Sequence, residues 1–189
     1  MTELGRRLFA SASLRHPLLA ELLAQSAATL KQRVNEIDAA EFARQSDENI
    51  AELVGAKAAF KALEVPFDKA KLSVEEVHHN NTVKASKSIP YFGDSALWQA
   101  KSERPLHSPP KAEVRGQAVV VGVEVSAVDI DQAKGYLDKA TTQLAECLTL
   151  QAKQIDRHNA ALPRAALPFV KERRKRLVQL AYLSQALGV

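Results

Sequence analysis

The sequence has few of the residues that build disulfide scaffolds, metal clusters or membrane spans. Cys147 is its single cysteine, which excludes an intrachain disulfide and a zinc site assembled from several cysteines. No apolar run approaches the roughly 18 residues that a bilayer-spanning helix needs. Glu3 and the lack of a continuous apolar stretch before Leu18 argue against a targeting peptide. We therefore expect a cytoplasmic chain without a membrane span.

Aromatic residues are also scarce, at 5% of the 189 residues, whereas apolar residues together make up 46%. The core should therefore consist mainly of Leu, Val and Ala, which favours helices. The length suits one compact domain of medium size, or one domain with a helical appendage. The expected fold is α+β and mostly helical, with an N-terminal helical region (1–64), a small antiparallel β region (65–127) and a C-terminal helical hairpin (128–189).

Three helices are expected in the first region. Leu14–Ile37 carries apolar residues at three- and four-residue spacings, which is typical of an amphipathic helix. Asp38, with Glu41 three residues later, has the spacing of a capping box and predicts a short helix. Ser46 and Asp47 predict the start of a third.

The middle region changes to strand-like patterns. Lys71–Val77 and Thr82–Tyr91 are expected to be strands. Lys111–Val125 predicts a hairpin that turns near residues 115–117, with alternating valines on one face of its second strand. Because the other face of that strand is also largely apolar, we expect it to be central in the sheet or covered by helices.

The last region predicts two long helices. The first begins at Asp129 or Asp131 and carries a narrow apolar stripe at nearly heptad spacing. Asn159 to Pro163 interrupts the stripe, and a second helix follows to about Leu187. Two long helices joined by a short break predict an antiparallel helical hairpin.

Positive charge is concentrated in the same region. The net charge is +4, and residues 151–189 contain eight basic and two acidic side chains. We predict that Lys171, Arg174 and Lys175 face outward together. Three interpretations stay open. The cations contact the phosphate backbone of nucleic acid, they contact an acidic protein or lipid surface, or they form a solvated helix face or a row of ion pairs with acidic groups such as Glu146 or Asp138 on the neighbouring helix. The candidate binding residues are Lys153, Arg157, Arg164, Lys171, Arg174 and Lys175.

A metal site is a remote alternative. Residues 75–79 contain two overlapping Glu-x-x-His spacings, which on a helix supply half of a di-iron site. The segment looks extended, so a polar edge strand is the competing interpretation, and no cofactor is expected. Glu76, His78 and His79 would be the ligands of a metal-dependent hydrolase, with His107 as a third histidine brought in by folding.

Four segments resemble one group of proteins. These segments are Ile89–Trp98, Pro109–Gly116, His158–Pro163 and Glu172–Leu177. They are similar to an accessory N-terminal region of bacterial multidomain proteins, some of them defence-system proteins, that precedes a C-terminal nuclease-like or TIR-like effector. The resemblance covers the second half of the chain and implies that the chain is one part of a longer protein. It supplies no catalytic residues.

These observations favour a non-enzymatic scaffold, sensor or protein-interaction module, with a role in antiphage defence implied by the resemblance. The protein partner, or a second copy of the chain, is expected to bind the helical hairpin. Nucleic-acid binding by the basic C-terminal helix is the alternative. No Walker loop, Gly-x-Gly-x-x-Gly or His-Glu-x-x-His motif indicates an enzyme.

Overall fold

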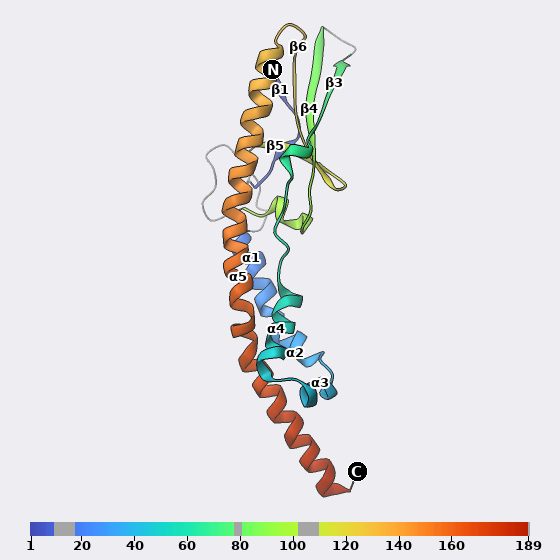
Figure 1. Cartoon of the computed structure of the whole chain (residues 1–189), viewed down its shortest axis with the longest axis vertical. Helices are drawn as coiled ribbons and strands as arrows, with labels where there is room; N and C mark the ends of the chain where they lie inside the picture. The colour runs from blue at the N-terminus through green and yellow to red at the C-terminus, as the bar shows by residue number, and fades with distance from the viewer. Residues whose placement is uncertain (10–17, 78–80, 102–109, 189) are drawn as a thin grey trace. The chain divides into compact units, whose positions relative to one another are not determined.

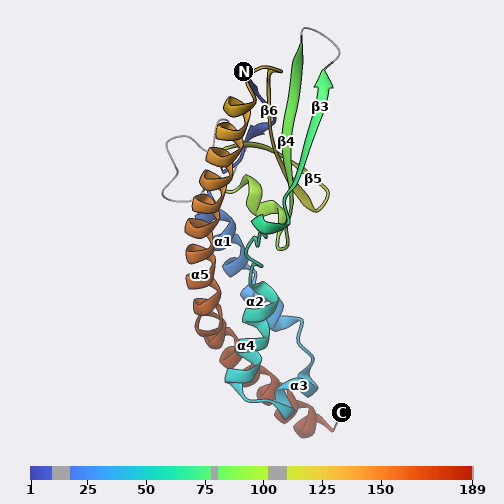
Figure 2. The ribbon, with the colours of Figure 1, turned by 45° about the horizontal axis from the view of Figure 1, so that its top comes forward.

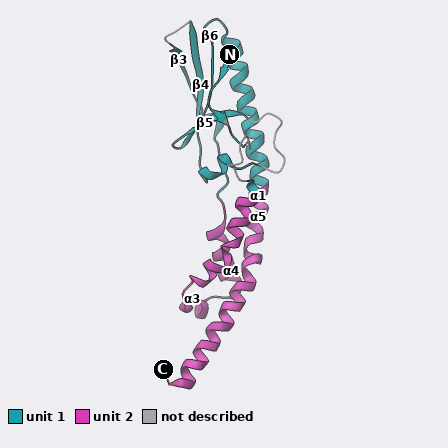
Figure 3. Ribbon diagram, turned by 180° about the vertical axis from the view of Figure 1, so that it is seen from behind, with its two compact units in different colours: residues 1–20, 61–153 teal, residues 21–60, 154–189 magenta. Residues whose placement is uncertain are grey.

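The computed structural model describes the chain except for residues 10–17, 78–80, 102–109 and 189. It has the expected α+β fold, with a small antiparallel sheet and a long C-terminal helix (Figure 1). The chain forms two compact units (Figure 3). Unit 1 consists of residues 1–20 and 61–153, and unit 2 of residues 21–60 and 154–189. Each unit therefore contains part of the C-terminal helix.

The sheet of unit 1 is antiparallel throughout and has the order β2-β5-β6-β4-β3, with β1 added to β6. Figure 2 shows β3 at one edge of this sheet, with β4 between it and β6. The expected strands at 71–77 and 82–91 are confirmed as β3 and β4. The bounds are β1 Thr2–Glu3, β2 Arg6–Arg7, β3 Lys71–Val77, β4 Thr82–Pro90, β5 Lys111–Arg115 and β6 Ala118–Ser126.

The valine-rich hairpin is confirmed as β5 and β6. Its turn includes Gly116 at φ +56°, a backbone conformation that a residue with a Cβ rarely adopts. The valines at 119, 121, 123 and 125 are all buried, and β6 is central. On the other face, a Cβ built on Gly122 would lie 2.8 Å from Leu4 Cδ1. Leu4 continues the pairing of β1 with β6, and its N–H donates to the Gly122 carbonyl at 2.9 Å, so glycine leaves room for the Leu4 side chain beside it. The prediction of a central strand is therefore confirmed.

Buried side chains in unit 1 also connect the segment between β4 and β5 with the helix that follows β6. Trp98, in the 3₁₀ helix η2 (Ser95–Gln99), packs edge-on against Tyr91 and also contacts Phe9. Gln151 is buried, and its Nε2 donates to the Leu97 carbonyl at 2.8 Å. A second 3₁₀ helix, η1 (Phe67–Lys69), precedes β3.

Unit 2 contains most of one short helix and all of three others, two of which begin at the expected capping residues. The bounds are α1 Leu19–Ala28, α2 Leu30–Asn35, α3 Ala39–Arg44 and α4 Asp47–Ala58. Asp38 accepts a hydrogen bond from the Ala40 N–H and caps α3, and Ser46 accepts one from the Asn49 N–H and caps α4. The expected single helix over 14–37 is wrong, because α1 and α2 are separate helices on either side of Thr29. Its first four residues lie outside the described residues.

The predicted helical hairpin is also wrong. One helix, α5 (Ile130–Leu187), runs through the expected break and contains Pro163 and Pro168 (Figure 1). A proline inside a helix costs about 3 kcal/mol because it removes a hydrogen bond and crowds the preceding turn. Burial of Leu162, Ala166 and Val170 in the core of unit 2 offsets that cost. The partner surface that depended on a hairpin is therefore absent.

Within the described part of the chain, no helix combines the length and the apolarity that crossing a membrane requires.

Candidate functional site

Four of the six predicted cations form one exposed row on the unit 2 part of α5. Arg157, Arg164, Lys171 and Lys175 are exposed and are separated by seven, seven and four residues. At 3.6 residues per turn these spacings keep the four side chains within about 40° of one another around the helix axis. At 1.5 Å per residue they extend over about 27 Å. We call this row the basic stripe.

The basic stripe has no internal counterion within the described ranges: none of its four members belongs to an ion pair there. Its cations are therefore available to a ligand. The neighbouring acid, Glu172, is already bonded to Arg176, and this hydrogen bond is the main reason why the pKa of Glu172 is lowered. Lys153 is also exposed, but it belongs to unit 1.

Arg174 does not join the stripe, and the prediction that it faces outward with Lys171 and Lys175 is wrong. Its Nε donates to the Asp47 carboxylate at 2.5 Å. Its two other nitrogens donate to the carbonyls of Phe42 and Gln45, and its guanidinium lies 5.5 Å from the centre of the Phe42 ring. All its partners belong to the junction of α3 and α4, so its role is structural.

An exposed apolar segment follows the basic stripe. Within it, Val178 is 65% and Tyr182 is 71% exposed. They follow Lys175 by three and seven residues, so they continue the face of the stripe. Of the other members, Leu183 lies about 100° around the helix axis from Tyr182, whereas Leu187 and Leu180 lie about 140° and 160° from it, on nearly the opposite side. We call the whole set the apolar tail: Val178, Leu180, Tyr182, Leu183 and Leu187.

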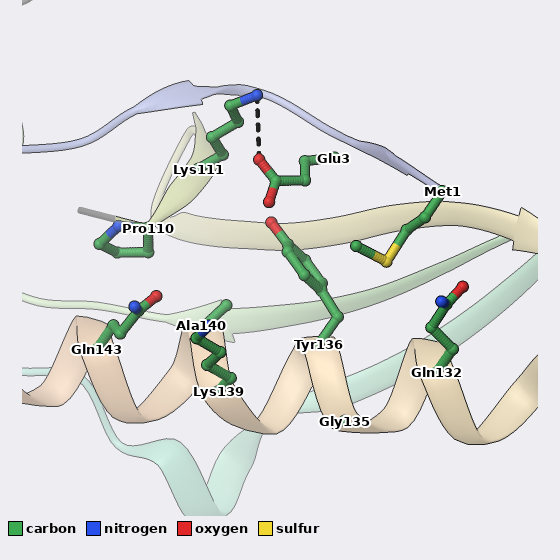
Figure 4. A pocket seen from close by; sticks show the side chains of 10 residues that line it. All are labelled: Met1, Glu3, Pro110, Lys111, Gln132, Gly135, Tyr136, Lys139, Ala140 and Gln143. Carbon is green, nitrogen blue, oxygen red and sulfur yellow. Dashed lines mark ion pairs between the residues drawn. The ribbon is translucent and has the colours of Figure 1, made fainter. Parts of the chain in front are cut away.

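Unit 1 contains a polar pocket of about 360 Å³ between the N-terminal strand, the start of β5 and α5 (Figure 4). Glu3 and Lys111 form an ion pair of 3.0 Å at its wall, and Tyr136 and Lys139 extend from the helix. Burial, with a smaller contribution from the Glu3 carboxylate, raises the pKa of Tyr136 to about 12. The phenol therefore stays protonated and can donate a hydrogen bond, but it is a poor general base.

Candidate metal ligands do not form a cluster in the described part of the chain. His78, His79 and His107 lie outside the described residues, and Glu76 is an exposed residue of β3. Cys147 is buried, and this burial, more than the nearby Glu146 carboxylate, raises the pKa of its thiol to about 11. Such a thiol is a weak nucleophile at neutral pH.

Two residues of unit 2 have packing roles that the sequence did not predict. Asn159 lies where a helix break was expected, yet its side chain accepts a hydrogen bond from the Phe60 N–H at 3.1 Å and donates one to the Phe60 carbonyl at 2.9 Å. Gly55 lies against Pro163, and a Cβ at position 55 would be 3.0 Å from the proline ring. Both contacts join residues about 100 positions apart in the chain, so no local sequence pattern indicated them.

Comparisons of the chain with protein-family models, with curated proteins and with solved structures give no match.

Proposed function

We propose that the chain is a non-enzymatic protein-interaction module whose binding surface is the basic stripe together with the apolar tail. The single observation that carries this proposal is the sequence of groups along one helix face, where four exposed cations are followed by Val178 and Tyr182. The proposed binding surface therefore lies on a single helix and not on the helical hairpin that the sequence predicted.

The apolar tail supplies the reason for a partner. Burying one side chain of this size stabilises a complex by about 1.5–3 kcal/mol when it leaves water completely. Contiguous exposed apolar groups bordered by charge are typical of interaction sites. The tail presents five such side chains, and no described residue of unit 2 covers them. Three of them, Val178, Tyr182 and Leu183, lie within about 100° of the face of the basic stripe.

The charges define the chemistry of the partner. A complementary partner surface has an apolar strip next to acidic side chains. The strip buries the tail while the acidic side chains pair with the cations. A second copy of this helix segment does not fit, because residues 171–188 contain only one acidic side chain, Glu172, which is bonded to Arg176. We therefore assign the surface to an acidic, apolar segment of a different protein.

A photocrosslinking experiment identifies that protein. Tyr182 is replaced by benzoylphenylalanine in cells that naturally produce the chain, the cross-linked protein is identified, and its affinity is measured with purified components. Val178→Glu and Leu183→Glu should each raise Kd at least tenfold. Val128→Glu is the matched control, because Val128 is an exposed apolar residue of unit 1. Equal affinity of the wild type and both tail variants would refute the proposal.

Nucleic-acid binding is the second candidate, and the alignment of the basic stripe favours it. Four phosphate contacts would give a slope of log K against log salt of about −3.6 for duplex DNA. With a labelled duplex as the probe, changing one stripe cation to glutamate should make the slope less steep by about one. Val178→Glu should leave this affinity unchanged, whereas it should weaken the acidic protein partner. The two candidates are therefore distinguishable.

A further inference from the structure

β3 is an edge strand whose outer side is open. Its residues pair with β4 on one side, and no other strand in the described part of the chain pairs with it. Six of its seven residues are exposed, including Leu72 at 68% and Val74 at 70%. An edge of this kind presents unpaired N–H and C=O groups to a further strand.

The buried face of the sheet continues onto this strand. Val74 lies opposite Ala85 of β4, which in turn lies opposite Val123 of β6. Directly paired residues share a face of the sheet. Ala85 and Val123 are buried, so Leu72 and Val74 extend the apolar face beyond its covered part.

We propose that β3 is the interface of a homodimer, in which the β3 strands of two copies pair antiparallel with Ser73 opposite Ser73 of the second copy. The sequence of β3 is self-complementary about this residue. Leu72 then lies opposite Val74 of the second copy, and Lys71 lies opposite Glu75. Because the axis is two-fold, each contact occurs twice.

Other registers lose these contacts. A shift by one residue places Leu72 opposite Glu75 in one direction, and opposite Ser73 with Lys71 facing Val74 in the other. A shift by two places Leu72 opposite Glu76, or opposite Leu72 with Lys71 facing no carboxylate. Opposite charges and apolar pairs directly across antiparallel strands are the contacts that stabilise a sheet. The register with Ser73 at its centre is the one that matches both kinds of pair.

The surroundings of Glu75 are compatible with a second cation. Its carboxylate lies 3.5 Å from Lys84 Nζ on β4, the side opposite to the proposed interface. In the dimer this carboxylate lies between Lys84 and Lys71 of the second copy. These two ion pairs favour one orientation of the paired strands, and they make the affinity of the dimer depend on salt concentration.

The first test uses charge reversal and mixing, with dimer formation measured by sedimentation equilibrium of the full chain. Lys71→Glu and Glu75→Lys should each raise the dimer Kd at least tenfold, because each places like charges opposite one another. An equimolar mixture of the two variants should recover dimers, since every Glu then faces a Lys. The chain carrying both changes should also dimerise.

Lys69→Glu is the matched control, since it makes the same charge change just before β3 and should leave Kd unchanged. The proposal is overturned if the wild type remains monomeric at millimolar concentration. It is also overturned if the mixture dimerises no more than the separate variants, which would show that the charges do not face each other.

The second test determines the strand register from disulfide formation between introduced cysteines in a glutathione buffer. Opposite residues of antiparallel strands have Cα atoms about 4.5–5.5 Å apart, within the range that a disulfide bridges. Ser73→Cys should therefore cross-link readily. Val74→Cys should not, because the two copies of residue 74 are offset by about 7 Å along the strands. Cys147 is buried and does not compete. Equal cross-linking of both variants would reject this register.

Discussion

The guanidinium of Arg174 and the carboxylate of Asp47 are hydrogen bonded at 2.5 Å, although 127 residues separate them in the chain. Asp47 begins α4, and the other acceptors of Arg174 are carbonyls at the C-terminal end of α3. Carbonyls at a helix end lack intrahelical partners. One side chain of α5 therefore donates hydrogen bonds to acceptors of both helices at their junction.

Arg174→Met should destabilise the α3–α4 junction by about 1.5–3 kcal/mol, the range for hydrogen bonds to charged groups. Arg174→Lys should recover only part of this, because an ammonium cannot reproduce the three-way geometry of the guanidinium. Amide hydrogen exchange across α3 and α4 measures the effect. Lys171→Met, an exposed change three residues away, should leave the exchange rates unchanged. Equal rates in both Met variants would contradict this role of Arg174.

Gly55→Ala should lower the melting temperature of unit 2. Alanine gains about 1 kcal/mol of helix propensity over glycine, but its Cβ would lie 3.0 Å from the rigid ring of Pro163. Overpacking of this kind costs about 1–3 kcal/mol, so the steric cost should exceed the gain.

Combining Gly55→Ala with Pro163→Ala checks the cause. Pro163→Ala removes the two ring carbons that lie 3.0 Å from the Cβ site and leaves the backbone nitrogen, so Gly55→Ala should cost less in this background than in the wild type and the two effects should not add. Additive effects in calorimetry would show that the proline is not the obstacle.

Asn159→Ala should accelerate hydrogen exchange at the Phe60 amide, because that N–H loses its only acceptor among the described residues. Loss of both hydrogen bonds should cost about 1–3 kcal/mol. Asn159→Asp is the informative comparison, since it keeps an acceptor for the N–H but loses the donor to the Phe60 carbonyl. Its exchange rate at Phe60 should lie nearer to the wild type. Unchanged exchange in the Ala variant would refute the contact.

Local signals in the sequence predicted much of the fold. Asp38 and Ser46 identified helix starts because a capping residue acts on backbone groups two or three residues away. The alternation of valines identified β6 because successive side chains of a strand point to opposite faces of the sheet, and these valines are buried together. Each of these signals involves neighbours in the chain, so one sequence contains the whole interaction.

The errors concern contacts that are distant in the chain. Pro163 predicted a break by its own chemistry, but its packing against Gly55 of α4 permits a continuous helix. Arg174 was assigned to the surface because helix periodicity places side chains around an axis without showing what lies beside them. The continuous helix, in turn, brings Arg157 and Lys171 onto one face, an alignment that the expected hairpin concealed.

The stability of unit 2 should fall as pH falls through the titration range of His158. The His158 side chain packs beside the Phe60 ring, with ring centres 6.5 Å apart, and its Nε2 is buried without a hydrogen-bond partner among the described residues. Burial lowers the pKa of His158 in the folded chain. In the unfolded chain a histidine titrates near 6.5.

The sign of the effect follows from proton uptake. Between the lowered folded pKa and about 6.5 the unfolded chain binds more protons at this histidine, so stability rises with pH across that window. The stabilising contribution is complete above about pH 6.5 and is lost as pH falls toward the folded pKa. His158→Gln removes this dependence. The difference in free energy of unfolding between the wild type and His158→Gln should therefore shrink between pH 7.5 and 5.5, measured by urea denaturation. The other titrating groups are common to both proteins and cancel in this difference. A difference that is constant with pH, or that grows on acidification, would show that His158 is not penalised for carrying a charge in the folded chain.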